Sequence, residues 1–273
     1  MSDCTGLEAD GDRSREVDPF VVALRELPKA HLHLHVIGAM RRRFLVSQFD
    51  PSVRGLFRRV YSQRQFAKLY DTAVLAVRSP ADFERLVFQV VEDQAADGVW
   101  WVEITIDPFL YKGRLGSPQR VLEMARDFGA AASERFGVGV GWIVCANRGN
   151  PAASTLAAEL AVSMVGDGVV GFGLAGDERL AGSGAFERPF RAARDAGLLL
   201  CPHAGELHNE VDIQRALMVL HPDRLGHALG AVRNPLLLRN LAERGVAAET
   251  APWSNVGLGL IAGCPPGVGT SVC

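Results

Sequence analysis

Short apolar runs alternate with longer amphipathic stretches along most of this chain. The apolar runs have the length that is typical of buried strands. The expected strands lie at residues 30–36, 99–106, 138–145, 169–174, 198–203, 224–229 and 246–252. Stretches with helical periodicity lie between several of them, at about 152–165, 185–196, 210–220 and 235–244. Strands that alternate with helices in this way predict βαβ units and a parallel sheet.

Two further helices carry clear start signals. Ser79-Pro80 supplies a capping serine and a proline in the first turn, and apolar residues then recur at helical spacing. Ser117-Pro118 opens a second helix in the same way, and this helix is expected to run to about Phe136 and to stop before Gly137. The two helices lie on either side of the strand expected at 99–106, so they continue the alternation of strand and helix.

The seven expected strands leave two α/β architectures to consider. A TIM (β/α)8 barrel typically takes about 250 residues and places its catalytic groups at the carboxyl ends of the strands. A doubly wound sheet usually carries a glycine-rich phosphate turn, which Gly171–Gly176 matches only loosely because no acidic residue follows at the expected distance. We therefore predict an α/β fold of the TIM (β/α)8-barrel type, incomplete because seven strands are recognisable.

Composition and charge are those of an ordinary globular protein. Of the 273 residues, 48% are hydrophobic and 22% are charged, and the formal net charge is −2. That charge gives no global field to attract nucleic acid or an anionic membrane, so we expect a small-molecule substrate. No uncharged apolar run approaches the ~20 residues needed to cross a bilayer. The five cysteines are scattered along the chain, as is typical of reduced thiols, so a cytoplasmic location is expected. No sequence pattern indicates an oligomeric state.

The chain is expected to divide into three segments. Residues 1–27 form a charged N-terminal extension that lacks the apolar run of a signal peptide. Residues 28–256 form the barrel, which is the catalytic domain. Residues 257–273 contain five glycines and two prolines but no charged residue, so this tail is expected to be irregular.

The strongest chemical signal is a group of alternating histidines, His31, His33 and His35, near the front of the chain. Successive side chains of an extended strand point to opposite faces, so these imidazoles are expected to share one face. Two imidazoles at i and i+2 can bind one metal ion, and imidazole suits zinc, iron, nickel or copper. We interpret two of the three as ligands and His31 as a packed neighbour; a solvated or packed histidine-rich strand is the alternative.

Further polar residues stand near the ends of later strands. His203 ends the fifth expected strand, Glu206 follows three residues later, and His227 lies in the sixth. Because parallel strand ends converge on one mouth, His203 is a natural third ligand. Glu206 could then move protons, and His227 could act as a base or an electrostatic partner for the attacking water. Each residue alone fits a core histidine or a helix-start carboxylate, but the combination favours a catalytic site.

Taken in order, the motifs of this chain resemble those of the adenosine deaminase family. They are Leu27-Pro28-Lys29, His33-Leu34-His35 with Gly38-Ala39, Gly171 to Glu178, His203-Ala204-Gly205-Glu206, Arg224-Leu225-Gly226-His227 and Pro252-Trp253-Ser254-Asn255. The resemblance implies a (β/α)8 metal-dependent hydrolase. Its reaction would replace the 6-amino group of adenosine, or of a related aminopurine nucleoside, by oxygen and release ammonia.

The resemblance also implies roles for individual residues. His33, His35 and His203 would bind one Zn²⁺ ion. Glu206 would donate a proton to N1 of the purine, and His227 would orient or deprotonate the attacking water. A zinc ion lowers the pKa of bound water, and attack at C6 requires a protonated ring nitrogen, so the implied roles agree with the chemistry of the residues.

Substrate contacts are implied in two places. The backbone N–H of Gly176 would hydrogen-bond the purine ring, and Asp177 would belong to the same substrate-binding segment. Typical family members carry an acidic residue for a ribose hydroxyl directly before the glycine that follows His-x-His, and this chain has Ile37 there. A site that hydrogen-bonds a substrate hydroxyl strongly prefers substrates that carry it, and Ile37 cannot make this bond. A different aminopurine nucleoside, such as aminodeoxyfutalosine, is therefore the alternative substrate.

The end of the chain departs from the family pattern. Family members continue to an eighth strand that ends in paired aspartates, one of which binds zinc, whereas residues 257–273 hold no carboxylate side chain. We therefore expect a chain truncated before the eighth strand. An inactive fragment or pseudoenzyme that lacks the metal-binding aspartate is the corresponding alternative to an active deaminase.

Overall fold

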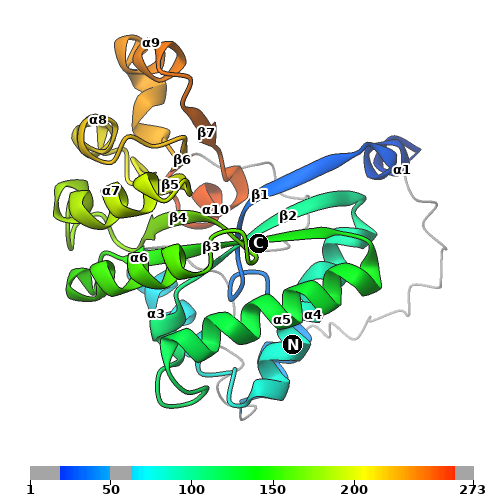
Figure 1. Cartoon of the computed structure of the whole chain (residues 1–273). Helices are drawn as coiled ribbons and strands as arrows, with labels where there is room; N and C mark the ends of the chain where they lie inside the picture. The colour runs from blue at the N-terminus through cyan, green and yellow to red at the C-terminus, as the bar shows by residue number, and fades with distance from the viewer. Residues whose placement is uncertain (1–18, 50–62, 262–273) are drawn as a thin grey trace, which may run out of the picture.

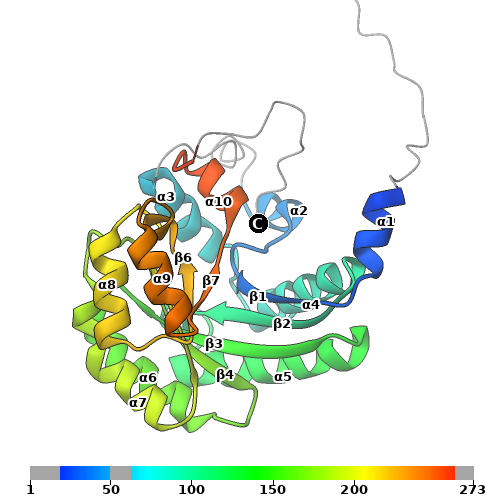
Figure 2. The ribbon, with the colours of Figure 1, turned by 90° about the horizontal axis from the view of Figure 1, so that it is seen from above.

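The computed structural model describes residues 19–49 and 63–261. Its seven strands form one parallel series in chain order, so that each strand pairs with the next. They are β1 Lys29–His35, β2 Val99–Ile106, β3 Gly139–Asn147, β4 Val169–Ala175, β5 Leu199–Ala204, β6 Arg224–His227 and β7 Ala247–Glu249. Seen from above, the strands curl into a nearly closed barrel (Figure 2). The predicted α/β fold of incomplete TIM-barrel type is confirmed.

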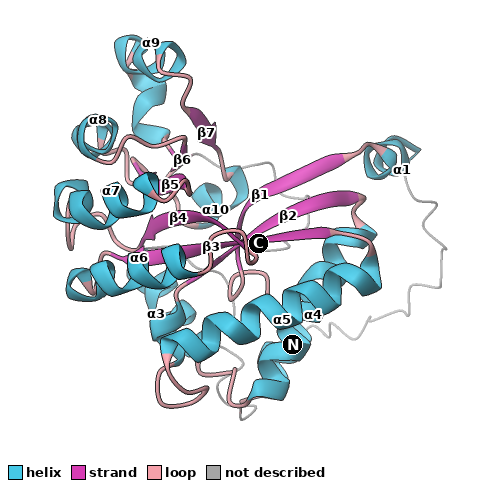
Figure 3. Ribbon diagram, viewed as in Figure 1, coloured by secondary structure: helices cyan, strands magenta, loops and turns pink. Residues whose placement is uncertain are grey.

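Helices alternate with the strands and cover the outside of the curl (Figures 1, 2 and 3). They are α4 Pro80–Ala96, α5 Pro118–Phe136, α6 Ser154–Ser163, α7 Glu187–Asp195, α8 Glu210–Val219 and α9 Pro235–Glu243. The remaining α-helices are α1 Pro19–Glu26, α2 Arg42–Ser47, α3 Gln63–Val74 and α10 Pro252–Gly257. Short 3-10 helices are η2 Pro108–Tyr111, η3 Pro151–Ala153, η4 Ser183–Phe186 and η5 Leu229–Arg233. None of the described helices is long and apolar enough to span a membrane.

The predicted helix caps are present. Ser79 Oγ accepts a hydrogen bond from the backbone N–H of Asp82 (3.2 Å), and Asp82 Oδ2 accepts one from the N–H of Ser79 (3.0 Å). Ser117 Oγ accepts from the N–H of Arg120 (3.2 Å) at the start of α5. That helix ends at Phe136 and is capped by Gly137, whose φ of 71° is the left-handed conformation that glycine adopts without a steric penalty.

The apolar core lies between the strands and the outer helices. The aromatic rings of Phe172 in β4 and Phe190 in α7 pack edge to face with centroids 4.9 Å apart. Inside the barrel, Gly139 and Gly141 of β3 leave room for the ring of Trp101 of β2, since a Cβ at Gly139 would lie 2.5 Å from that ring. The strands are therefore held mainly by apolar packing against the outer helices. Polar side chains can occupy the inner face of the barrel.

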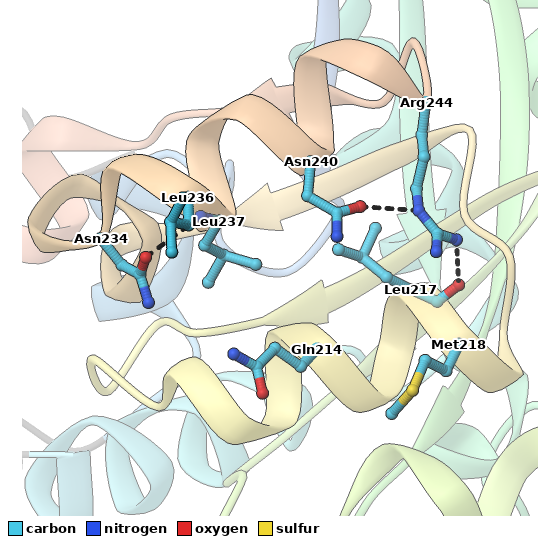
Figure 4. Close-up of a pocket in the computed structure, with 8 residues that line it drawn as sticks. All are labelled: Gln214, Leu217, Met218, Asn234, Leu236, Leu237, Asn240 and Arg244. Carbon is cyan, nitrogen blue, oxygen red and sulfur yellow. Dashed lines mark hydrogen bonds between the residues drawn. The ribbon is translucent and has the colours of Figure 1, made fainter.

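A groove of about 340 Å³ lies between α8 and α9 (Figure 4). Arg244 bounds it by donating to the carbonyl of Leu217 (3.1 Å) and to Asn240 Oδ1 (2.7 Å). No histidine or carboxylate is among the residues that line it. The groove therefore offers no acid, base or metal ligand, in contrast to the strand ends.

The structure describes only part of the three expected segments. Helix α1 belongs to the 1–27 extension, and its side chains are exposed. Residues 1–18 of that extension and residues 262–273 of the predicted tail lie outside the described residues. The division into extension, barrel and tail stays a prediction.

Candidate active site

Three histidines from two strands meet at the carboxyl end of the barrel. His33 and His35 come from β1, and His203 comes from β5. The Nε2 atom of His203 lies 3.0 Å from Nε2 of His35 and 3.1 Å from Nε2 of His33. One ligand atom from each ring lies within 4.8 Å of the other two, so this group could hold a metal ion. The structure thus brings together the three residues that were predicted as ligands.

The chemistry of this donor set fits a zinc ion. Burial, reinforced by the neighbouring imidazoles, lowers the pKa of His35 to about 3 and holds the pKa of His203 well below its ordinary value. Both rings are therefore neutral at pH 7, the state that a metal ligand requires. Zn–N distances of 2.0–2.1 Å in a tetrahedron put ligand nitrogens about 3.3 Å apart, close to the distances of His203 Nε2 from His35 Nε2 and from His33 Nε2.

Strand β6, which pairs with β5 beside His203, leaves room for these rings. Gly226 of β6 faces the cluster, and a Cβ at this position would lie 2.9 Å from Cε1 of His33 and 3.1 Å from Cγ of His203. Any larger residue would displace the two rings. Steric room for the two imidazoles therefore explains why the Arg224–His227 motif has glycine at position 226.

His31 does not share the face of the other two histidines, so that expectation is wrong. Its Nδ1 lies 2.8 Å from Oε1 of Gln94, which belongs to the outer helix α4. The pairing of β1 with β2 has an irregular register between His31 and Leu34, and such a bulge breaks the simple alternation of side chains. His31 is a packed neighbour, as expected, but on the helix side of the strand.

Glu206 lies in the loop after β5, buried at the barrel mouth. Burial is the main cause that raises its pKa to about 7, and the nearby carboxylates of Glu178 and Asp177 add to it. Glu178 itself accepts a hydrogen bond from the backbone N–H of Glu206 (2.9 Å). The result is a buried carboxylic acid that can give or take a proton near neutral pH.

His227 ends β6 and lies 3.6 Å from this acid, measured from its Nε2 to Oε1 of Glu206. Nδ2 of the buried Asn255 in α10 donates to Nδ1 of His227 (3.1 Å). Burial lowers the pKa of His227 to about 4, so the ring is neutral at pH 7 and its proton lies on Nε2. The φ of His227 is 66°, an uncommon conformation for a non-glycine residue, and it turns the chain sharply at the mouth.

A family model described as "Adenosine deaminase" matches residues 28–264. The chain belongs to the adenosine deaminase family. As a member of this family it is a hydrolase that acts on a C–N bond, which confirms the predicted reaction class.

Named relatives of this family member carry several substrate names. A "Putative adenosine/adenine deaminase" of Streptomyces coelicolor is 39% identical over 255 residues, covering 86% of this chain and 74% of that protein. An "Aminodeoxyfutalosine deaminase" of the same organism is 31% identical over 263 residues, covering 90% of this chain and 66% of that protein. The crystal structure of an adenine deaminase from Arthrobacter aurescens superposes with a TM-score of 0.78 at 25% identity, covering 85% of this chain and 74% of that one.

The substrate contacts implied by the family resemblance lie on the loop after β4. Gly176 has a φ of 101°, and a Cβ there would lie 3.1 Å from Asn147 Oδ1 and 3.3 Å from the backbone nitrogen of Arg148. The carboxylate of Asp177 is engaged by Arg179, whose Nε donates to it at 2.8 Å. Asp177 is thus placed on the right loop, but its charge is already paired. The roles of both residues stay predictions.

Two charged residues that no sequence pattern had indicated contact the histidines of the site, one of them buried (Arg148) and one half-buried (Glu249). Arg148, which follows β3, donates from Nη2 to the carbonyl of His203 (2.8 Å) and to Asp212 Oδ2 (2.6 Å). Glu249 ends β7 and lies with Oε2 3.0 Å from Nδ1 of His33. In the sequence, Arg148 follows one expected strand and Glu249 lies within another, but no local pattern distinguishes them from surface charges.

Proposed function

We propose that this chain catalyses the hydrolytic deamination of a 6-aminopurine, with one zinc ion held by His33, His35 and His203. The observation that carries the proposal is the meeting of three imidazoles with a protonatable carboxylic acid and a neutral histidine at one barrel mouth. A bound zinc ion would supply Lewis-acid activation of water. The family assignment supports the same reaction.

The side chains divide the remaining work between them. Glu206 is protonated in part at pH 7 because of its raised pKa, so it can donate a proton to the ring nitrogen next to the amino-bearing carbon. His227 presents its Nε2–H toward Glu206 and can orient the attacking water by hydrogen bonding. The backbone N–H of Gly176 is the proposed donor to another ring nitrogen, which would fix the purine in the mouth.

The identity of the substrate depends on what surrounds the purine. Ile37, where typical family members have an acidic residue, is a buried apolar side chain that cannot accept a hydrogen bond from ribose. A free base needs no such contact, so we propose adenine ahead of adenosine. Aminodeoxyfutalosine stays the alternative, since a relative named for that substrate is 31% identical.

Metal content and ammonia release test the proposal together. The purified chain should contain zinc and release ammonia from at least one of adenine, adenosine and aminodeoxyfutalosine. Glu206→Gln should lose turnover but keep zinc, whereas Glu243→Gln, an exposed carboxylate on α9, should behave as wild type. A chain with neither zinc nor turnover would contradict the proposal, and retained purine binding in that case would favour the pseudoenzyme alternative.

A further inference from the structure

Glu249 links a candidate metal ligand to a charged network inside the barrel. Its Oε2 lies 3.0 Å from Nδ1 of His33, and its Oε1 accepts from Nε of Arg224 at 2.5 Å. The carboxylate therefore contacts His33 on the nitrogen that does not face the other histidines. Its side chain is only 10% exposed, so water competes little for these contacts.

The network continues across the barrel. Arg224, at the start of β6, also donates from Nη2 to Oε2 of Glu103 in β2. Trp101 Nε1 donates to the other oxygen of Glu103 at 3.1 Å. The side chains of Arg224 and Glu103 are 13% and 6% exposed. Strands β2, β6, β7 and β1 are thus connected by one series of charged and polar side-chain contacts.

We propose that Glu249 is a positioning residue that holds a proton on Nδ1 of His33 and leaves Nε2 to face the metal. A neutral imidazole carries one N–H, and an adjacent carboxylate selects the nitrogen that carries it. Nε2 is then left as a lone pair, 3.1 Å from Nε2 of His203. Arg224 in turn fixes the carboxylate. The metal part of this inference rests on the proposed function.

A purely structural ion pair would predict a different outcome, so the variants are chosen to separate the two. Glu249→Leu removes the acceptor for the Nδ1 proton but leaves Arg224 paired with Glu103. Glu249→Gln keeps an acceptor oxygen and loses the charge. Glu243→Gln on α9 changes an exposed carboxylate that is not part of this network and serves as the matched control.

The first measurement needs no metal. Ring ¹⁵N chemical shifts of the metal-free protein at about pH 8, where histidine is ordinarily neutral, report which nitrogen of His33 carries the proton. We expect the Nδ1–H tautomer in wild type, Glu249→Gln and Glu243→Gln, and a shift towards Nε2–H in Glu249→Leu. An unchanged His33 tautomer in a folded Glu249→Leu protein would overturn the inference.

The second measurement is zinc affinity by competition with a chromophoric chelator. We expect a roughly 10-fold to 100-fold weaker affinity for Glu249→Leu, a smaller loss for Glu249→Gln and none for Glu243→Gln. If Glu249→Leu does not fold, Glu249→Gln decides, and wild-type affinity in that variant contradicts the inference. A wild-type chain that binds no zinc would contradict the proposed function, whereas the tautomer measurement would still test Glu249.

Discussion

The carboxylate of Glu178 accepts a hydrogen bond from the backbone N–H of Glu206, with Oε1 2.9 Å from the nitrogen. The loop after β4 thereby holds the loop after β5 and brings one buried carboxyl group close to another. Two carboxyl groups in one dry environment cannot both ionise easily, so the charge of Glu178 helps to raise the pKa of Glu206. A structural hydrogen bond and the tuning of the proposed acid are therefore one feature.

Replacing Glu178 by Gln should move the alkaline limb of the activity profile. The amide keeps an acceptor oxygen for the Glu206 N–H but removes the negative charge, so the pKa of Glu206 should fall below about 7. Because burial is the larger cause of the raised pKa, Glu178→Gln should lower the pKa of Glu206 by less than exposing Glu206 to water would. The pH dependence of kcat/KM measures it, with the exposed Glu187→Gln as control. An unchanged limb would show that Glu178 only holds the loop.

The activity profile of the wild type should be bounded by two groups. His227, with its pKa lowered to about 4, must be neutral, so activity is expected to fall below that pH. Glu206, with its pKa raised to about 7, must be protonated, so activity should fall as the pH rises through that value. Glu206→Gln should lose turnover across the whole pH range. A profile that instead keeps rising above pH 7 would assign the proton transfer to another group.

The same pKa makes a prediction about stability in the metal-free protein. Between the ordinary value of 4.5 and about 7, unfolded chains release the Glu206 proton while folded chains retain it, so stability should decline as the pH rises through this window. Glu206→Gln removes this dependence. In denaturant unfolding, the free energy of unfolding of the variant relative to wild type should therefore be higher at about pH 8 than at about pH 5. An equal difference at both pH values would contradict the raised pKa.

Most of the architecture could be predicted because it is written in local patterns. Apolar runs between helical stretches located all seven strands, and Ser79 and Ser117 marked helix starts that the structure contains. The convergence of His33 and His203 followed from one further rule, that parallel strand ends meet at one mouth. These inferences need only periodicity, caps and topology.

The remaining features depend on contacts between distant residues. His33 and Glu249 are 216 positions apart, and their contact depends on how far the sheet curls. Arg148 looks like a surface charge in the sequence, yet its guanidinium is fully buried against Asp212. The orientation of His31 depends on a register irregularity that no residue pattern announced. Curvature, register and buried ion pairs are products of the whole fold, so local sequence rules do not reach them.

Gly226→Ala should weaken zinc binding without unfolding the chain. The new Cβ would lie 2.9 Å from Cε1 of His33 and 3.1 Å from Cγ of His203, so both rings must move. Metal sites tolerate little displacement of their ligands, and we expect at least a roughly 10-fold loss of affinity. Gly257→Ala is the control, because a Cβ there meets nothing within 4 Å. Wild-type zinc affinity in Gly226→Ala would show that the two rings can move without loss of metal binding.

Asn255 should matter to catalysis through His227 alone. Asn255→Ala removes the donor to Nδ1, so the ring loses its fixed tautomer, and kcat should fall by about 10-fold to 100-fold with zinc content unchanged. Asn255→Asp replaces the donor by an acceptor and should move the proton to Nδ1, which ¹⁵N shifts can detect. Asn240→Ala, on the surface of α9, is the control. Full activity in Asn255→Ala would remove His227 orientation from the mechanism.

The buried pair of Arg148 and Asp212 should stabilise the chain and hold a candidate ligand. Arg148→Met leaves Asp212 without its ion partner and frees the carbonyl of His203, so we expect a loss of about 3–5 kcal/mol in the free energy of unfolding. The double variant Arg148→Met/Asp212→Leu should recover much of that loss, because no uncompensated charge is left buried. It should nevertheless bind zinc more weakly than wild type, since the carbonyl of His203 still lacks its donor. Denaturant unfolding of both variants, with the exposed Arg194→Met as control, measures the first effect, and chelator competition measures the second. If the double variant regains wild-type zinc affinity, Arg148 serves the stability of the barrel and not the placement of His203.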